Sequence, residues 1–136
     1  MKHTLEHTIY YADTDSYGVV WHGTYLRFME QARVEFCRQI GLDLLEMKAN
    51  DIVIPVTNLN IRYKASAKLD DKVITETEIT KITPITVVFK QVIKDKKTEK
   101  IYTTAEIEVV CINNEGKLYH RIPDILKTKC EKAMAN

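Results

Sequence analysis

The sequence predicts an α+β fold in which one long helix packs on an antiparallel β-sheet. One strand comes first, a single long amphipathic stretch follows, and the rest of the chain is almost all strand-like. A parallel sheet would need a crossover, usually a helix, between successive strands, and the strand-rich part has none. A chain of 136 residues has the size of one domain, so we expect residues 1–136 to form a single domain.

The first two elements follow from local patterns. Leu5–Tyr11 is strand-like and ends at a cluster of Asp, Ser and Gly. A helix of about five turns is predicted over Gly23–Ile40, with Thr24 as its N-cap and Gly41 as its stop signal. Its apolar residues recur every three or four positions, at Tyr25, Phe28, Met29, Ala32, Phe36 and Ile40.

The remaining elements are a helical turn near Leu44, a series of strands and a C-terminal helix over Asp124–Ala135. The strands are predicted over Ile52–Tyr63, Asp71–Ile82, Thr86–Asp95 and Lys100–Asn113, which gives about five to six in all. The last of these alternates most clearly and predicts one buried face, formed by Ile101, Thr103, Ala105, Ile107 and Val109. One helix cannot cover both faces of such a sheet. We therefore expect a homo-oligomer, and the sequence leaves a homodimer or homotetramer open.

Composition excludes several classes of function. Twenty basic and 19 acidic residues leave a net charge of +1, which gives no positive field for nucleic acid. The first residues contain no apolar signal segment, and no stretch approaches the roughly 20 apolar residues of a membrane span. Three cysteines without C-x-x-C spacing indicate free thiols, and Cys37 and Cys111 are expected to be buried. We expect a cytoplasmic protein.

The segment ADTDSYGVVWHGTYLRF combines acids, a glycine and a histidine before the helix. Its D-x-D-x-x-G spacing suggests a calcium loop. Such a loop needs an oxygen ligand at its fifth position and a bidentate glutamate at its twelfth, and this chain has Tyr17 and Thr24 there. A transition-metal site of Asp13, Asp15 and His22 lacks a second histidine at suitable spacing. We expect no metal and no other cofactor.

Two interpretations of this segment remain from the residues alone. The acids and Gly18 are ordinary turn and capping residues, yet Val20 and Trp21 would place apolar side chains beside them. Free N–H groups at a helix start can stabilise a carbonyl oxygen that gains negative charge, and a nearby carboxylate can attack that carbonyl or activate water. No G-x-S-x-G motif supports serine hydrolysis.

The run from Tyr11 to His22, with Tyr25, Phe28, Glu30 and Arg33, resembles the signature of hotdog-fold acyl-CoA thioesterases. The resemblance is to the 4-hydroxybenzoyl-CoA thioesterase family, closest to its Tol–Pal-associated branch, and it covers nearly the whole chain. It implies a central helix wrapped by an antiparallel sheet, paired subunits that share the site, and hydrolysis of an acyl-CoA thioester. It leaves the acyl group, and CoA or acyl carrier protein as the thiol carrier, open.

The resemblance also assigns roles. Asp15 corresponds to the catalytic nucleophile or general base, and Asp13 shapes the loop. His22 is expected to place substrate or activate water while its backbone N–H polarises the carbonyl, with Tyr11 as hydrogen-bonding support. The expected substrate contacts are Tyr25, Val20 and Trp21.

Other charged residues receive no catalytic role. Glu30 lies three residues before Arg33 on the helix, and we expect a structural ion pair between them. The residues Arg62, Lys64, Lys68 and Lys90 are candidates for the CoA phosphates, and none is assigned. The alternative to an enzyme is a non-catalytic hotdog module that binds acyl-CoA or a protein partner, and a hotdog dehydratase is a weaker third interpretation. The presence of Asp15, His22 and Tyr11 favours the enzyme, because a pure binding module has no need of a carboxylate beside an electrophilic carbonyl.

Overall fold

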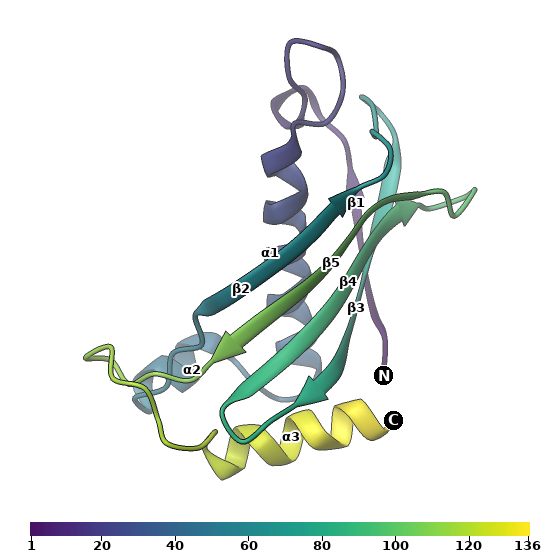
Figure 1. The fold of residues 1–136 in the computed structure, drawn as a ribbon. Helices are drawn as coiled ribbons and strands as arrows, with labels where there is room; N and C mark the ends of the chain where they lie inside the picture. Colours follow the sequence, from purple (N-terminus) through teal and green to yellow (C-terminus); the bar gives the residue numbers. More distant parts are fainter.

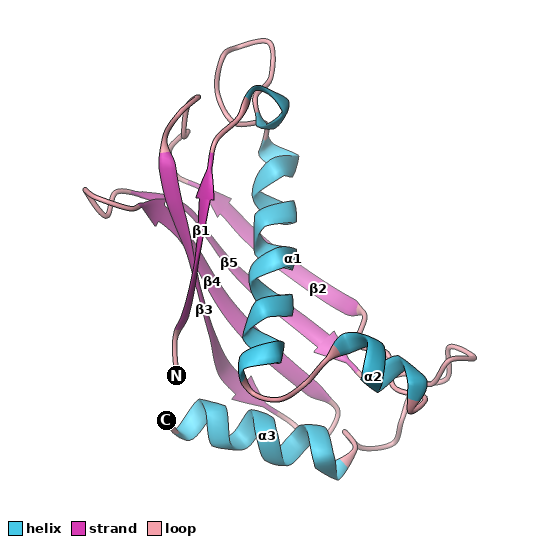
Figure 2. Ribbon diagram, turned by 180° about the vertical axis from the view of Figure 1, so that it is seen from behind, coloured by secondary structure: helices cyan, strands magenta, loops and turns pink.

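The computed structural model describes all residues 1–136 and confirms the α+β class (Figure 1). A 3-10 turn over Tyr11–Asp13 precedes the long helix. In chain order the elements are β1 (His3–Thr8), α1 (His22–Gln39), α2 (Leu44–Ala49), β2 (Val56–Tyr63), β3 (Lys72–Ile82), β4 (Thr86–Asp95), β5 (Ile101–Val110) and α3 (Asp124–Ala135). Seen from behind, α1 lies along one face of the sheet and α3 crosses one end of it (Figure 2).

The five strands form one antiparallel sheet in the order β1-β3-β4-β5-β2. Short hairpins join β3, β4 and β5, while β2 comes earlier in the chain and adds to the far side of β5. The two edges are therefore β1 and β2. Seven of the eight residues of β2 are exposed, so this edge is uncovered in the single chain.

The face of the sheet toward α1 follows the alternation predicted from the sequence. Thr103, Ala105, Ile107 and Val109 of β5 are all buried, whereas Ile101, which was also expected on this face, is 40% exposed at the start of the strand. Ile107 pairs with Phe89 of β4, which pairs in turn with Ile79 of β3, so one apolar row runs across three strands. This row forms the floor on which α1 packs.

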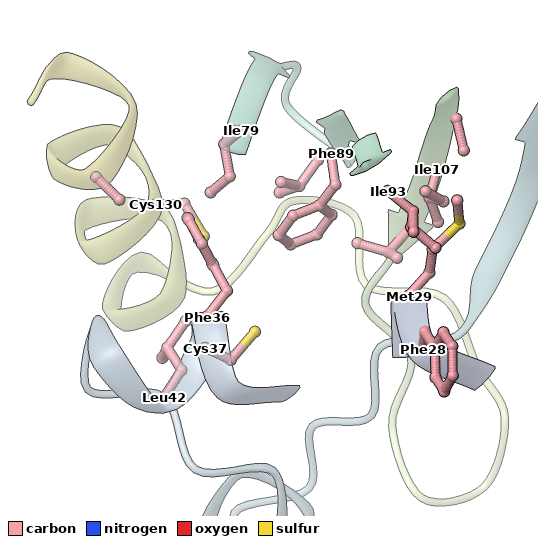
Figure 3. Packing of buried hydrophobic residues seen from close by; sticks show 14 of the residues in the cluster. Phe28, Met29, Phe36, Cys37, Leu42, Ile79, Phe89, Ile93, Ile107 and Cys130 are labelled. Atoms are coloured by element: carbon pink, nitrogen blue, oxygen red, sulfur yellow. The ribbon is translucent and has the colours of Figure 1, made fainter. Parts of the chain in front are cut away.

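The core lies between α1, this floor and α3 (Figure 3). Met29 and Phe36 of α1 are completely buried, and the Phe36 ring meets the edge of Phe89 at 5.7 Å between centroids. Leu126 and Cys130 of α3 close the same core. Burial of each such side chain contributes about 1.5–3 kcal/mol, so α1 is held by its apolar stripe more than by helix propensity.

A polar link fixes α1 over the centre of the sheet. Gln91 of β4 is fully buried, and its Nε2 donates to the Met29 carbonyl and to Thr77 Oγ1, both at 2.9 Å. Its Oε1 accepts from Arg33 Nη1 at 2.9 Å. Because a buried amide is costly when unpaired, these bonds select one position of the helix along the strands.

Several expected details were wrong. The helix begins at His22 with Trp21 as its N-cap, because Thr24 lies inside the first turn and its hydroxyl donates to the Asp13 carbonyl at 3.0 Å. The strand expected from Ile52 begins at Val56, after Pro55, which has no N–H for the sheet. The first strand ends at Thr8, before the 3-10 turn that contains Tyr11. The last strand ends at Val110.

The expected ion pair between Glu30 and Arg33 does not form either. The Arg33 guanidinium turns inward to Gln91, while Glu30 stays exposed on the helix surface. Helical spacing of three residues allows such a pair, but the buried amide offers Arg33 a partner nearer the sheet.

His7 of β1 should make stability depend on pH. Its ring stacks on Phe28 at 4.1 Å, and burial, with a smaller contribution from Arg27, lowers its pKa from 6.5 to about 4. Between these values the unfolded chain binds a proton that the folded chain does not, so the free energy of unfolding falls as pH falls through this window.

Denaturant unfolding at about pH 7 and about pH 5 measures this dependence. We expect wild type to lose more stability over that interval than His7→Phe, which keeps the stacking but cannot take up the proton. Equal losses in the two proteins would contradict the assignment to His7.

Candidate active site

Asp13 is a structural residue that fastens the segment before α1 to the helix. Its side chain is 6% exposed, Oδ2 accepts from the Tyr10 N–H at 2.9 Å, and Oδ1 pairs with Arg27. Its backbone carbonyl accepts from the Trp21 N–H at 2.9 Å and from Thr24. Both carboxylate oxygens are thus occupied, which agrees with the loop-shaping role expected for this acid.

Asp15 differs from Asp13 because its carboxylate is only partly used. It is half-buried, and Oδ1 accepts from the Tyr17 N–H at 2.8 Å. No hydrogen bond or ion pair engages Oδ2 within the chain. A short hairpin holds the residue, with Thr14 bridged to Val20 and with Gly18 at a φ of 79° that favours glycine. The Asp15 N–H donates to the carbonyl of Val19, three residues before α1 begins, and one carboxylate oxygen remains available.

The first turn of α1 leaves N–H groups unpaired. Trp21 makes no side-chain cap, and the amides of His22 and Gly23 donate to no group of the chain. A Cβ at Gly23 would lie 2.3 Å from the Trp21 ring, so only glycine allows the indole to fold back over this turn. Free N–H groups at the positive end of a helix bind an oxygen that carries negative charge.

Aromatic side chains lie beside the exposed His22. The Tyr63 hydroxyl, at the end of β2, donates to the His22 carbonyl at 2.9 Å, and the two rings meet edge to face at 6.3 Å. Tyr25 is 2% exposed, and its ring centroid lies 5.8 Å from that of Tyr63. The Tyr25 hydroxyl accepts a hydrogen bond from the Ala67 N–H. Burial raises the pKa of Tyr25. These contacts make Tyr25 a support beneath the helix start.

The other expected site residues differ in how far they are exposed. Tyr11 is 80% exposed and its hydroxyl makes no hydrogen bond within the chain. Val20 is buried, while Trp21 is half exposed beside the His22 ring at 5.0 Å. Sequence reasoning missed Gly23 and Tyr63. Gly23 follows His22 directly and had a signal as a small residue at a helix start, whereas Tyr63 lies 41 residues from His22 and had none.

An apolar cavity of about 250 Å³ lies farther along α1. Two of its lining residues are exposed, so it opens to the surface between α1 and β2. Neither Asp15 nor His22 contributes to it. The lining residues are Glu30, Arg33, Val34, Cys37, Leu44, Ile54, Val56, Phe89 and Val109.

No three His, Cys, Asp or Glu side chains gather closely enough to hold a metal ion. Of the candidates for CoA phosphates, Arg62 and Lys90 share a shallow polar hollow on the outer face of the sheet with Glu106, and Lys64 and Lys68 are exposed beyond β2. No helix is long and apolar enough to cross a membrane.

Comparison with known proteins agrees with this architecture. Residues 17–102 match the thioesterase superfamily. The chain is 35% identical over 105 residues to the acyl-CoA thioester hydrolase YbgC of Escherichia coli O6:H1, which covers 77% of this chain and 78% of the relative. It is 35% identical over 108 residues to the acyl-CoA thioesterase YbgC of Haemophilus influenzae, with 77% and 76% covered.

Solved structures show the same fold. DHNA-CoA thioesterase from Staphylococcus aureus superposes with a TM-score of 0.89 at 30% identity, covering 98% of this chain and 91% of that one. A mutant of 4-hydroxybenzoyl-CoA thioesterase, crystallised with 4-hydroxybenzoyl-CoA, superposes with a TM-score of 0.86 at 20% identity. The chain therefore belongs to the thioesterase superfamily, with the hotdog fold of a thioester hydrolase.

Proposed function

We propose that this protein hydrolyses acyl-CoA thioesters to a free carboxylic acid and CoA, with Asp15 as the catalytic carboxylate. One observation carries the proposal: a carboxylate with a free oxygen lies in the hairpin that leads into an uncapped helix start. Two relatives that are 35% identical to this chain are acyl-CoA thioesterases, which gives the substrate class.

The reaction needs a group that stabilises the negative charge on the carbonyl oxygen and a nucleophile that attacks the carbonyl carbon. The thioester carbonyl oxygen accepts from the N–H groups of His22 and Gly23, so charge that develops there faces the positive end of α1. Removing one such donor from other enzymes costs about 10²–10³ in rate, so this contact is a large part of the expected catalysis.

Asp15 completes the reaction by one of two routes. As nucleophile, its oxygen bonds to the carbonyl carbon, the C–S electrons leave with CoA, and water then hydrolyses the mixed anhydride. As general base, it takes a proton from water while the resulting hydroxide attacks the carbonyl, and CoA leaves as the thiolate. His22 and Tyr11 would position the water or the thioester in either route.

The proposal includes a two-fold dimer formed through β2. This edge presents Val56, Leu59 and Tyr63 with 47%, 40% and 45% of their surface exposed. Unpaired strand N–H and C=O groups next to exposed apolar side chains favour pairing with a second copy. Antiparallel pairing of β2 with its copy would continue the sheet across both subunits.

Such a dimer would join the helix start of one subunit to the cavity of the other. Within one chain α1 runs opposite to β2, since His22 bonds to Tyr63 while Cys37 and Val56 share the cavity. The start of α1 and Arg33 are roughly 16 Å apart along the helix at 1.5 Å per residue. Antiparallel strands bring the Val56 end of one copy to the Tyr63 end of the other. The cavity would then receive the acyl group.

Release of free thiol from a panel of acyl-CoA esters, short to long and aliphatic to aromatic, tests the proposed activity. We expect hydrolysis of at least one ester, with one acid formed for each thiol. An oligomeric, folded protein that binds esters without releasing thiol would instead support a binding module. The same panel on acyl carrier protein separates the two thiol carriers. Three buried free cysteines fit the cytoplasmic location that this substrate implies.

A further inference from the structure

Arg33 is a charged residue in the wall of the apolar cavity. Its Nη1 donates to the neutral amide of Gln91, and it forms no ion pair within the chain. A guanidinium carries five N–H donors, so this single bond leaves others without a partner. Burial lowers the pKa of Arg33, and the nearby Glu30 and Cys37 oppose that shift without forming an ion pair with the guanidinium. The cavity thus holds donors that a ligand can satisfy.

Glu30 adds an acceptor to the same wall. It lies one helical turn before Arg33, is exposed, and likewise forms no ion pair. A plain hydrocarbon in the cavity would displace water from the half-buried Arg33 without replacing its hydrogen bonds, which is unfavourable, while the exposed Glu30 stays solvated. A carboxylate would meet the negative charge of Glu30. A hydroxyl donates one hydrogen bond and accepts others, so it suits both residues.

The size of the cavity agrees with a short acyl chain. Its volume of about 250 Å³ exceeds the roughly 150 Å³ of an apolar cavity that binds benzene. Apart from the two charged residues, all seven lining residues are apolar, which suits the carbon chain that would precede the hydroxyl.

We propose that Arg33 is a specificity-determining residue, which selects acyl groups that end in a hydroxyl over acyl groups that end in a methyl. This inference rests on the proposed function, because it takes the cavity as the acyl site of the dimer. A site built to bond a hydroxyl rejects the analogue without it, since its own polar groups are left unpaired.

Calorimetric binding of two esters tests this proposal: 6-hydroxyhexanoyl-CoA and heptanoyl-CoA, whose acyl groups have equal numbers of heavy atoms. Binding is measured on Asp15→Asn, so turnover does not interfere. We expect the hydroxy ester to bind at least about tenfold more tightly. Adding Arg33→Met, which keeps the apolar stem, should remove the preference, and Arg33→Lys should keep part of it. Adding Arg38→Met, an exposed arginine paired with Glu35 on the same helix, should leave it unchanged.

The outcomes separate the two proposals. Equal binding of the two esters to Asp15→Asn with Arg33 intact would overturn the inference on Arg33. Tighter binding of adipoyl-CoA than of 6-hydroxyhexanoyl-CoA to the same protein would overturn it as well. Absence of thiol release by wild type would instead overturn the proposed function. Arg33→Met removes the donor to the buried Gln91 Oε1 but keeps the Gln91 bonds to Met29 and Thr77, so its unfolding midpoint is measured beside its binding, and Arg33→Lys serves as the variant that retains a donor. A general loosening of the helix would weaken both esters alike and leave their ratio unchanged, which would also contradict a role in selection.

Discussion

Asp15→Asn is expected to lower the kcat for acyl-CoA hydrolysis by about 10³-fold while the protein stays folded. The substitution keeps the size of the side chain and an oxygen that can accept from the Tyr17 N–H, so the hairpin should persist. It removes the negative charge that attacks the carbonyl or takes the proton. Thiol release and the unfolding midpoint, measured on the same sample, check both halves of this expectation.

Asp124→Asn is the matched control for this change. Asp124 is exposed and begins α3, which crosses the end of the sheet opposite to the start of α1 (Figure 2), so the control removes the same charge from a position with no role in the proposed reaction. We expect its turnover to stay near that of wild type. An Asp15→Asn enzyme that retains normal turnover would remove Asp15 from the mechanism.

Asp13→Ala should lower stability more than turnover, and we expect it to reduce the free energy of unfolding by about 2–3 kcal/mol. Asp13 is buried, and its loss would leave the Tyr10 N–H without an acceptor and Arg27 without its carboxylate. Half of the Arg27 side chain remains exposed, which limits the cost because water can solvate it.

Denaturant unfolding measures this effect as a lower midpoint with an unchanged slope. Turnover of the folded fraction should fall far less than in Asp15→Asn, because Asp13 holds the segment and does not touch the reacting atoms. A stable Asp13→Ala protein without activity would reverse the roles assigned to the two acids.

The sequence was sufficient to predict the elements whose signals are local. The three- and four-residue spacing from Tyr25 to Phe36 predicted α1, and the alternation from Ile101 to Val109 predicted the buried face of β5 except for Ile101 at its exposed end. The acids before the helix led to the proposed site because a carboxylate beside a helix start has a specific chemical use, and that assignment stays a prediction. These features depend only on neighbouring residues.

Other features depend on contacts between distant parts of the chain. The bond from Tyr63 to the His22 carbonyl spans 41 residues, and nothing in the local pattern of β2 predicts it. The helical spacing of Glu30 and Arg33 predicted an ion pair, but a buried amide 58 residues away in sequence binds Arg33 instead. Tertiary contacts of this kind outweigh local preferences because a buried polar group must be satisfied.

Subunit mixing tests the central claim, that Asp15 of one subunit acts on an acyl group held in the cavity of the other. Asp15→Asn lacks the carboxylate, and Val34→Trp should fill the cavity, so each dimer alone should be inactive. After unfolding and refolding together, half of the dimers should be mixed, and each has one site with both parts intact. We expect thiol release to recover to about one quarter of the wild-type rate. A mixture that exchanges subunits but remains inactive would contradict the shared site.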